Sequence, residues 1–396
     1  MTPAVTVIGG GMIVHDQILP SLYQLQRLGM VGAIAVCAQH GRTVRTLAAN
    51  ETIRAAFPGH TFAGFPDAPV DADTAYPLLY REVLARMAGR GIAVVALPDH
   101  LHFDAVMDAL RADQHVLVVK PLVLRAWQAE AIAKEAAERE LLVGIEYHKR
   151  LDDRSLMARR KYRAGEFGEF RLGTACLLEK WYYRHSNFQN WFTCENSDAF
   201  TYIGCHYVDL VHFITGLLPK AVSVYGVKDK LPNGNLGYLW TDARVLWENG
   251  ACLNVQNALG FPDAAPGTNT QGLTMYCSAG DRGAYLRHSD QYRGLEYVYK
   301  DATYAEPSPD YFQYVEAGGG MLKPVGYGYR SIEHIVGTML RVENAGDRRA
   351  ALGEVDREGL IATPGNSMYN ERVIEAGRES IVNGGREVEL RHGASS

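Results

Sequence analysis

The stretch that decides the fold is Val5-Thr-Val-Ile-Gly-Gly-Gly-Met-Ile-Val14. An apolar run stops at three glycines, and a helical spacing of apolar residues begins directly after them. A glycine permits the tight turn, and a second one lets the backbone approach phosphates because it has no Cβ. The helix start adds unpaired N–H groups and a partial positive charge. The pattern predicts a site for a dinucleotide pyrophosphate, with contacts from Gly9, Gly11, Met12 and Ile13.

The ribose end of this predicted site departs from the NAD pattern. In NAD-binding folds a carboxylate near the end of the second strand binds the ribose hydroxyls. Here the predicted strand 31–37 is followed by Ala-Gln-His-Gly-Arg, without a carboxylate. Gln39 or His40 is the candidate for the ribose. Arg42 or Arg45 is the candidate for a 2′-phosphate, unless both lie on a solvated helix face. The expected cofactor is NAD, and NADP stays open.

Strands and helices alternate through the first 147 residues. The predicted strands are 92–97, 115–119 and 141–146, and the predicted helices are 78–87, 103–111 and 126–139. This alternation predicts a doubly wound parallel sheet, a Rossmann domain over 1–147, with a long loop at 55–75. Ligands bind beyond the carboxyl ends of such strands. The residues just past predicted strand ends are Pro98, His102, Lys120, Tyr147 and His148. Pro98 and Lys120 are expected cofactor contacts, and His102 either lies near the nicotinamide or is a helix-start residue with no ligand role.

The sequence pattern changes from about Phe167 onward. A strand at 170–178 and an apolar helix from Ile203 to Gly216 come first, and Gly216 is the expected helix stop. Short turns then separate strand-like runs at 221–227, 243–247, 251–258, 273–278, 283–286 and 294–299. They predict a second α+β domain over 148–396 with a large, open, mostly antiparallel sheet. Late helices at 331–342 and 367–382 close the chain, and packing back on the first domain is an option for them.

Composition limits the function classes. The chain has 396 residues, 47% hydrophobic, 21% charged, with a net charge of −5. This argues against a nucleic-acid or anionic-membrane partner, and no apolar run reaches the length of a membrane span. The six cysteines show no C-x-x-C pair, which fits reduced thiols in a cytoplasmic protein.

An ordered set of motifs extends over nearly the whole chain. It comprises the glycine turn, Pro98-x-x-x-His102, Val119-Lys120-Pro121, Arg150, Gly165-x-x-Gly168, Gly204-x-His206-x-x-Asp209 and the ending 373–386. The set resembles the glucose–fructose oxidoreductase / inositol dehydrogenase / MocA (Gfo/Idh/MocA) family. The resemblance implies an N-terminal Rossmann domain, a C-terminal open sheet, and NAD(P)-dependent oxidation or reduction of a sugar or cyclitol carbon.

The resemblance also implies catalytic residues. The family's lysine matches Lys120, which would hydrogen-bond the reacting hydroxyl and contact the cofactor, although Val119 replaces the glutamate before it. The catalytic histidine matches His206 and the downstream aspartate matches Asp209. The upstream aspartate falls on Tyr202, so a simple carboxylate–imidazole dyad is absent. The four predicted catalytic residues are Lys120, His206, Tyr202 and Asp209.

The residue chemistry agrees with this outline. Hydride removal from a carbinol carbon needs a base for the hydroxyl proton, and the imidazole of His206 suits that role near neutral pH. A lysine polarises the oxygen. Asp209 lies three residues after His206, so it either orients His206 or lines a sugar pocket. The spacing His206, Asp209, His212 departs from one helical face, and no metal site is predicted.

The segment 181–192 is rich in aromatic and amide side chains. Aromatic rings stack on sugars and amides bind hydroxyls, so this segment is the predicted substrate loop, unless its aromatics pack between domains or subunits. Lys149 and Arg150 either contact substrate or pair with carboxylates. The predicted substrate contacts are Lys120, Tyr147, His148, Lys149, Arg184, Asn190, Trp191, His206 and Asp209.

Three functions fit these observations. The first is an NAD(P)-dependent dehydrogenase acting on a sugar, glycoside or cyclitol. The second is an NAD-dependent glycoside hydrolase that works by transient oxidation, elimination and reduction. The third is a non-catalytic nucleotide- or sugar-binding protein. The resemblance implies a homodimer or homotetramer packed through the second-domain sheet.

Overall fold

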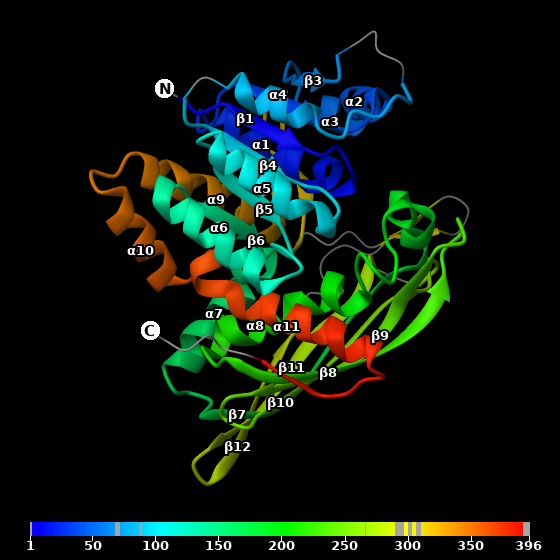
Figure 1. The fold of residues 1–396 in the computed structure, drawn as a ribbon, viewed down its shortest axis with the longest axis vertical. Coiled ribbons are helices and arrows are strands. Elements are labelled where there is room, and N and C mark those ends of the chain that lie inside the picture. Colours follow the sequence, from blue (N-terminus) through cyan, green and yellow to red (C-terminus); the bar gives the residue numbers. More distant parts are fainter. Residues whose placement is uncertain are drawn as a thin grey trace. The chain divides into compact units, whose positions relative to one another are not determined.

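The computed structural model describes residues 2–67, 72–87, 89–265, 267–289, 297–299, 303–305 and 310–390. The chain forms two compact units (Figure 1). The first comprises 1–122, 127–148 and 312–366, and the second comprises 123–126, 149–311 and 367–396. Residues 312–366 thus belong to the first unit, although they lie between two segments of the second.

The first unit contains a six-stranded parallel sheet in the order β3-β2-β1-β4-β5-β6. Apolar runs form these strands because helices cover both faces of a parallel sheet, as the fully buried β1 and β4 show. The order reverses direction at β1, so a ligand crevice is expected at the carboxyl ends of β1 and β4. The strands are β1 (Val5–Ile8), β2 (Ile34–Cys37), β3 (Ala63–Phe65), β4 (Ile92–Val95), β5 (His115–Val119) and β6 (Val143–Glu146).

Helices connect these strands. A π-helical turn (Val14–Ile18) precedes α1 (Leu19–Arg27), whose second residue Pro20 has no N–H to donate. Helix α9 contacts α1 and lies close to β6, where Gly144 leaves space for Ile335. The others are α2 (Gly41–Ala48), α3 (Glu51–Ala56), α4 (Leu79–Ala85), α5 (His102–Arg111), α6 (Ala126–Arg139), α9 (Tyr327–Glu343) and α10 (Arg348–Glu358), with the hairpin β15 (Gln313–Glu316) and β16 (Leu322–Val325).

The expected loop at 55–75 is partly wrong. It contains the edge strand β3, which has no apolar run to signal it. Backbone pairing alone adds β3 to the sheet, as in the bond from the Ala38 N–H to the Phe65 carbonyl, 2.9 Å. Strand pairing with a distant partner is not written in local sequence.

The second unit contains a seven-stranded sheet in the order β12-β11-β7-β10-β9-β8-β17, in which only β7 and β10 pair in parallel. Together with the first sheet it confirms the predicted fold class. The strands are β7 (Glu169–Lys180), β8 (Pro219–Lys230), β9 (Leu236–Trp247), β10 (Cys252–Phe261), β11 (Asn269–Ala279), β12 (Arg282–His288) and β17 (Val388–Glu389), with a separate pair β13 (Tyr297–Tyr299) and β14 (Thr303–Ala305). Residues 294–296 of the strand predicted at 294–299 lie outside the described residues.

One face of this sheet is covered by helices. Helix α11 lies over β8, where the Val224 N–H donates to Ser380 Oγ at 2.9 Å (Figure 1). Helix α8 ends at Gly216, which has a φ of +83° as expected for a glycine stop. The helical segments are α7 (Asp153–Arg163), α8 (Cys205–Thr215), α11 (Pro364–Val382), a π-helical turn (Phe200–Gly204) and 3₁₀ turns at His148–Leu151, Trp181–His185 and Asn187–Asn190.

No helix in the described part of the chain is long and apolar enough to span a membrane. All six cysteines are described, and all are free thiols.

Candidate functional site

The glycine turn has the geometry that a phosphate cradle requires. Gly9 has a φ of +121°, and a Cβ there would lie 2.1 Å from the carbonyl oxygen of Ala96. A side chain at Gly9 is therefore excluded by backbone conformation and by β4. Gly11 differs, since a Cβ there would meet no atom within 4 Å. The backbone at Gly11 is open on this side, which fits the close approach of a pyrophosphate.

The helix start after Gly11 exposes donors. The N–H groups of Val14 and His15 bond to the Gly11 carbonyl at 3.0 and 3.2 Å. No side chain in the described part of the chain caps Ile13, and the Met12 side chain is 38% exposed. The N–H groups of Val14 and His15 are thus used inside the turn, and those of the residues just before Val14 are the candidates for an anion. The predicted residues Gly9, Gly11, Met12 and Ile13 all lie in this turn.

The predicted ribose residues lie at the carboxyl end of β2, next to the turn. Gln39 is exposed, and its carbonyl accepts the N–H of Tyr76 at 2.8 Å. His40 precedes α2 and is half-buried. Arg42, in the first turn of α2, forms an ion pair with Asp73. No carboxylate stands directly after β2, and Asp73 comes to Arg42 from another segment.

His102 is held by the backbone on both sides of its ring. It follows Pro98 and the 3₁₀ turn Asp99–Leu101, and its side chain is fully buried. Its Nε2 lies 2.8 Å from the Leu97 carbonyl, and its Nδ1 lies 2.8 Å from the Pro121 carbonyl. Both ring nitrogens are engaged by backbone, which fits the alternative without a ligand role, and a contact of His102 with the cofactor stays a prediction. The ring joins the loop after β4 to the loop after β5.

Lys120 is the first residue after β5, partly buried and directly before the segment that His102 holds. Val119, in place of the family's glutamate, packs against the apolar core of the first unit. An apolar side chain suits that position because a carboxylate there would be desolvated.

A carboxylate that the sequence analysis missed lies at the end of β6. Glu146 is buried and accepts from Gln17 Nε2 at 2.9 Å, and its second oxygen lies 3.1 Å from His148 Nδ1. Gln17 also donates to the Gly328 carbonyl at 3.0 Å. Glu146 thus fixes His148 and links β6 to the π-helical turn. Its signal in the sequence was a carboxylate ending an apolar strand.

The remaining predicted residues of the first unit follow Glu146. Tyr147 is buried, whereas His148 keeps partial exposure and lies against the ring of Tyr327, with centroids 5.4 Å apart. Within this unit, the predicted residues after β1, β2, β4, β5 and β6 all share the carboxyl edge of one sheet.

In the second unit, His206 is the second residue of α8 and is buried. The π-helical turn before it contains Tyr202 and is anchored by Asp198, which accepts from the Thr201 N–H at 2.8 Å and from Thr201 Oγ1 at 2.7 Å. Arg378 of α11 pairs with the same carboxylate at 3.4 Å. Asp198 thereby fixes the start of the segment that carries both predicted residues.

The carboxylate of Asp209 is surrounded by donors from other elements. Its carboxylate accepts from Arg150 Nε and Nη2 at 2.8 and 2.6 Å, and from the Tyr369 hydroxyl at 2.8 Å. Burial raises the pKa of Tyr369 well above its ordinary value, so this hydroxyl stays protonated and donates. Both oxygens of Asp209 are occupied, and we assign this residue to structure in place of orienting His206. Arg150 pairs with a carboxylate, which was one of its two predicted alternatives.

Lys149 is buried, donates to Gln271 Oε1 and lies 5.4 Å above the ring of Tyr207. Its ammonium group is used inside the unit, and its contact with substrate stays a prediction.

The predicted substrate loop packs around the side chain of Arg184. Its guanidinium is buried, lies 3.8 Å from the ring centroid of Trp181 and 5.2 Å from that of Trp240. It donates to the Leu259 carbonyl at 2.5 Å and pairs with Asp229 at 2.6 Å. Arg184 thus helps to fold this segment through its Nε and Nη1 groups, and its hydrogen bond to a substrate hydroxyl stays a prediction.

The aromatics of the segment pack on each other. Phe188 lies 4.4 Å from Phe192, 4.8 Å from Trp191 and 5.0 Å from Tyr202, measured between ring centroids. Trp191 keeps partial exposure, and Asn190 bonds to Asn187 at 2.7 Å near the surface. The candidates of this segment for binding a ligand are therefore Asn190 and Trp191. Tyr202, in the π-helical turn that follows, is a further candidate.

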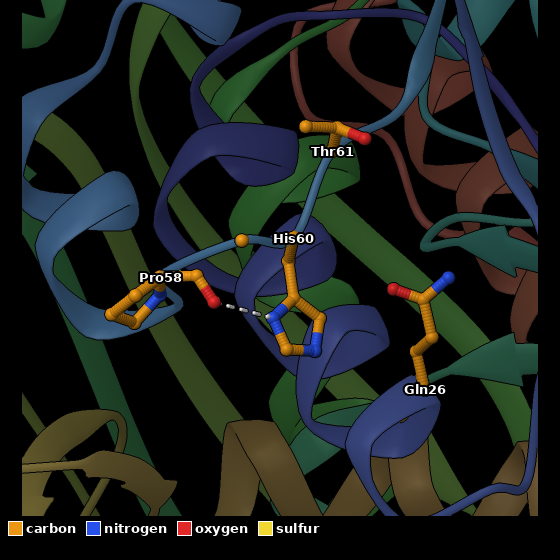
Figure 2. A pocket seen from close by; sticks show the side chains of 5 residues that line it. Gln26, Pro58, His60 and Thr61 are labelled. Atoms are coloured by element: carbon orange, nitrogen blue, oxygen red, sulfur yellow. Dashed lines mark hydrogen bonds between the residues drawn. The ribbon is translucent and has the colours of Figure 1, made fainter.

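Two other features of the described residues lie outside these candidates. No group of three or more His, Cys, Asp or Glu side chains among them is placed to hold a metal ion. A shallow cavity of about 330 Å³ is lined by Gln26, Pro58, Gly59, His60 and Thr61 (Figure 2). It lies at the last turn of α1, whereas the glycine turn precedes the first, and it contains no predicted site residue.

Comparison with known proteins identifies residues 4–147. Residues 4–147 match the model of the Gfo/Idh/MocA family, described as an oxidoreductase family with an NAD-binding Rossmann fold. This segment belongs to the Gfo/Idh/MocA family. For this segment, the predicted family, oxidoreductase class and NAD cofactor are thereby confirmed. No curated protein sequence matches the chain.

Solved structures share the fold over the whole chain. GenD2 from gentamicin A biosynthesis, in complex with NAD, has a TM-score of 0.69 at 17% identity, covering 99% of this chain and 97% of its own. Myo-inositol 2-dehydrogenase from Lactobacillus plantarum gives 0.66 at 14% identity, covering 99% and 100%. Scyllo-inositol dehydrogenase from Lactobacillus casei, with NAD(H) and scyllo-inositol, gives 0.64 at 13%, covering 98% and 99%. At these identities the likeness extends to the fold alone.

Proposed function

We propose that this protein is an NAD(P)-dependent oxidoreductase that transfers a hydride between nicotinamide and a carbinol carbon of a sugar, glycoside or cyclitol. The observation that carries the proposal is the glycine turn, whose Gly11 backbone is open where a Cβ would meet no atom, in a segment of an NAD-binding family. Structural neighbours that carry NAD and scyllo-inositol fit the same class of reaction. When bound, the nicotinamide supplies the hydride acceptor or donor.

The chain's own residues supply the proton chemistry. We assign Lys120 to the hydrogen bond that polarises the reacting hydroxyl and His206 to the removal of its proton. Tyr202 and Trp191 contribute to the sugar site, as do Asn190 and His148. Asp209 supports His206 indirectly, because its ion pair with Arg150 and the hydrogen bond it accepts from Tyr369 fix helix α8.

The test is a panel of sugars, cyclitols and glycosides, each with NAD and with NADP. Reduced nicotinamide is read by absorbance and released aglycone is read separately. Net reduction of the nicotinamide by at least one polyol supports the proposal. Glycoside cleavage without net reduction assigns the protein to redox-assisted hydrolysis. Cofactor binding without turnover on any member assigns it to the binding class.

Variants test the two assignments. We expect Lys120→Ala and His206→Ala each to lower kcat by on the order of a hundredfold or more, with nearly unchanged Kd for the cofactor, as for groups that act on a proton. Asn190→Ala is the matched control, since it changes an exposed side chain and should alter KM more than kcat. Unchanged turnover in His206→Ala would remove its catalytic assignment.

The cytoplasmic location and the homodimer or homotetramer stay predictions. A surface on the second-unit sheet supports self-association. Tyr285, Tyr276 and Leu172 are adjacent across β12, β11 and β7, and they are 65%, 51% and 48% exposed. A row of large apolar side chains on an uncovered face suits contact with a second copy.

A further inference from the structure

The first turn of α2 lies directly beside the glycine turn. An ideal Cβ at Gly10 would lie 2.8 Å from Cγ2 of Thr43 and 3.2 Å from Cβ of Ala38. The segment 38–43 therefore borders the place where a dinucleotide's phosphates and ribose approach. Its single charged side chain is Arg42. A guanidinium here is suited to a 2′-phosphate, which it can bind through two parallel hydrogen bonds.

Residues 72–76 lie against the first turn of α2 and place Asp73 next to it. The Arg42 N–H donates to the Ala72 carbonyl at 3.2 Å, and the Tyr76 N–H donates to the Gln39 carbonyl at 2.8 Å. His40 and Ala75 form an antiparallel bridge between the two segments. These backbone contacts place Asp73 against Arg42, where the two side chains form an ion pair.

The exposure of this pair determines what it can do. The Arg42 and Asp73 side chains are 61% and 70% exposed, so water screens their attraction and the pair contributes little to the fold. The exposed Arg42 guanidinium can therefore exchange this partner for a charged ligand. Asp73 neutralises the guanidinium and, as an anion, disfavours the approach of a phosphate dianion.

We propose that the Arg42–Asp73 pair sets the choice between NAD and NADP. Asp73 supplies from residues 72–76 the negative charge that the end of β2 lacks, and it holds Arg42 away from a 2′-phosphate. The chain thus prefers NAD, and removing the Asp73 carboxylate releases Arg42 to bind NADP. This inference rests on the proposed function, because it assumes that the cradle binds a nicotinamide dinucleotide.

The experiment measures the dissociation constants of NADH and NADPH by fluorescence titration, without substrate. We expect Asp73→Asn to lower the Kd of NADPH by about tenfold and to change that of NADH less than threefold, an effect of charge that weakens in high salt. Arg42→Gln should cancel this gain in the double variant. Glu358→Gln is the matched control, because it removes another exposed carboxylate paired with an arginine, Arg341, and should leave both constants unchanged.

Two results would overturn the inference. One is an unchanged ratio of the two constants in Asp73→Asn. The other is an equal gain with and without Arg42, which would mean a general charge effect. Wild-type protein that binds neither nucleotide would refute the proposed function and this inference together, whereas NADH binding with an unchanged ratio refutes the inference alone. Thermal midpoints check folding of each variant.

Discussion

At the residue scale, charges that looked catalytic in the sequence are divided between two uses. Asp209 is buried and both of its oxygens accept hydrogen bonds inside the second unit, while Lys120 remains partly exposed at a strand end. The distinction matters because a buried ion pair with satisfied geometry holds elements together, whereas a group that moves protons must reach the ligand.

Replacing Asp209 separates these uses. We expect Asp209→Asn to lower the free energy of unfolding by about 3–5 kcal/mol, because it leaves the buried Arg150 guanidinium without its counter-charge. Tyr369→Phe is the matched control, which removes one hydrogen bond to the same carboxylate and should cost about 1 kcal/mol. Urea unfolding measures both. Wild-type stability in Asp209→Asn combined with a large loss of kcat would restore Asp209 to the catalytic group.

At the element scale, the β1–turn–helix unit was readable because local geometry alone defines it. Apolar β1 must be buried, three glycines must turn, and the amphipathic spacing must form a helix. The same holds for β5 and α6, whose predicted bounds match, and for the stop of α8 at Gly216. Strand β3 and the ion pair of Arg42 with Asp73 depend on pairing between distant segments, which local pattern does not encode.

Two glycines of the turn should respond differently to one methyl group. Gly9→Ala should lower the thermal midpoint of the first unit by several degrees or prevent folding, because φ is +121° and the Cβ would lie 2.1 Å from Ala96 O. Gly11→Ala should leave the midpoint within about two degrees, since the added Cβ meets open space, but weaken NADH binding at least tenfold. Equal effects of both substitutions on stability would contradict the cradle.

At the scale of the whole molecule, one half-buried histidine couples stability to pH. Burial lowers the pKa of His212 to about 4, although the bond to the Leu217 carbonyl opposes the shift. Its ring stacks on Tyr369, with centroids 4.0 Å apart. The native pKa lies below the ordinary value of 6.5, so the unfolded chain takes up the proton first as the pH falls. The stability contribution is complete above pH 6.5 and is lost as the pH falls towards 4.

We expect this one group to remove about 3 kcal/mol of stability between pH 7 and pH 4. The measurement is urea unfolding of wild type and of His212→Asn, in which the amide can keep the bond to the Leu217 carbonyl without titrating. The difference in unfolding free energy between the two proteins should be larger at pH 7 than at pH 4. A difference that is the same at both pH values would refute the assignment.

Self-association is the second property at this scale. Tyr276→Lys combined with Leu172→Lys places charges in the centre of the exposed row on the second-unit sheet, so we expect smaller assemblies by light scattering after gel filtration. Val382→Lys, another exposed apolar position, is the control and should leave the mass unchanged. An unchanged mass in the double variant would locate any interface elsewhere.

The sequence by itself determined the parallel sheet with its glycine turn, the mostly antiparallel second sheet and the family of residues 4–147. These follow from the period of apolar residues, the positions of glycines and the order of motifs, which are all properties of the sequence alone. Only the tertiary structure decided which polar groups are spent on structure. The partners of these groups lie elsewhere in the chain. They are Pro121 for His102, Leu259 for Arg184 and Tyr369 for Asp209. Whether a buried polar group serves folding or a ligand depends on whether those distant partners have already satisfied it, and chain packing alone sets that.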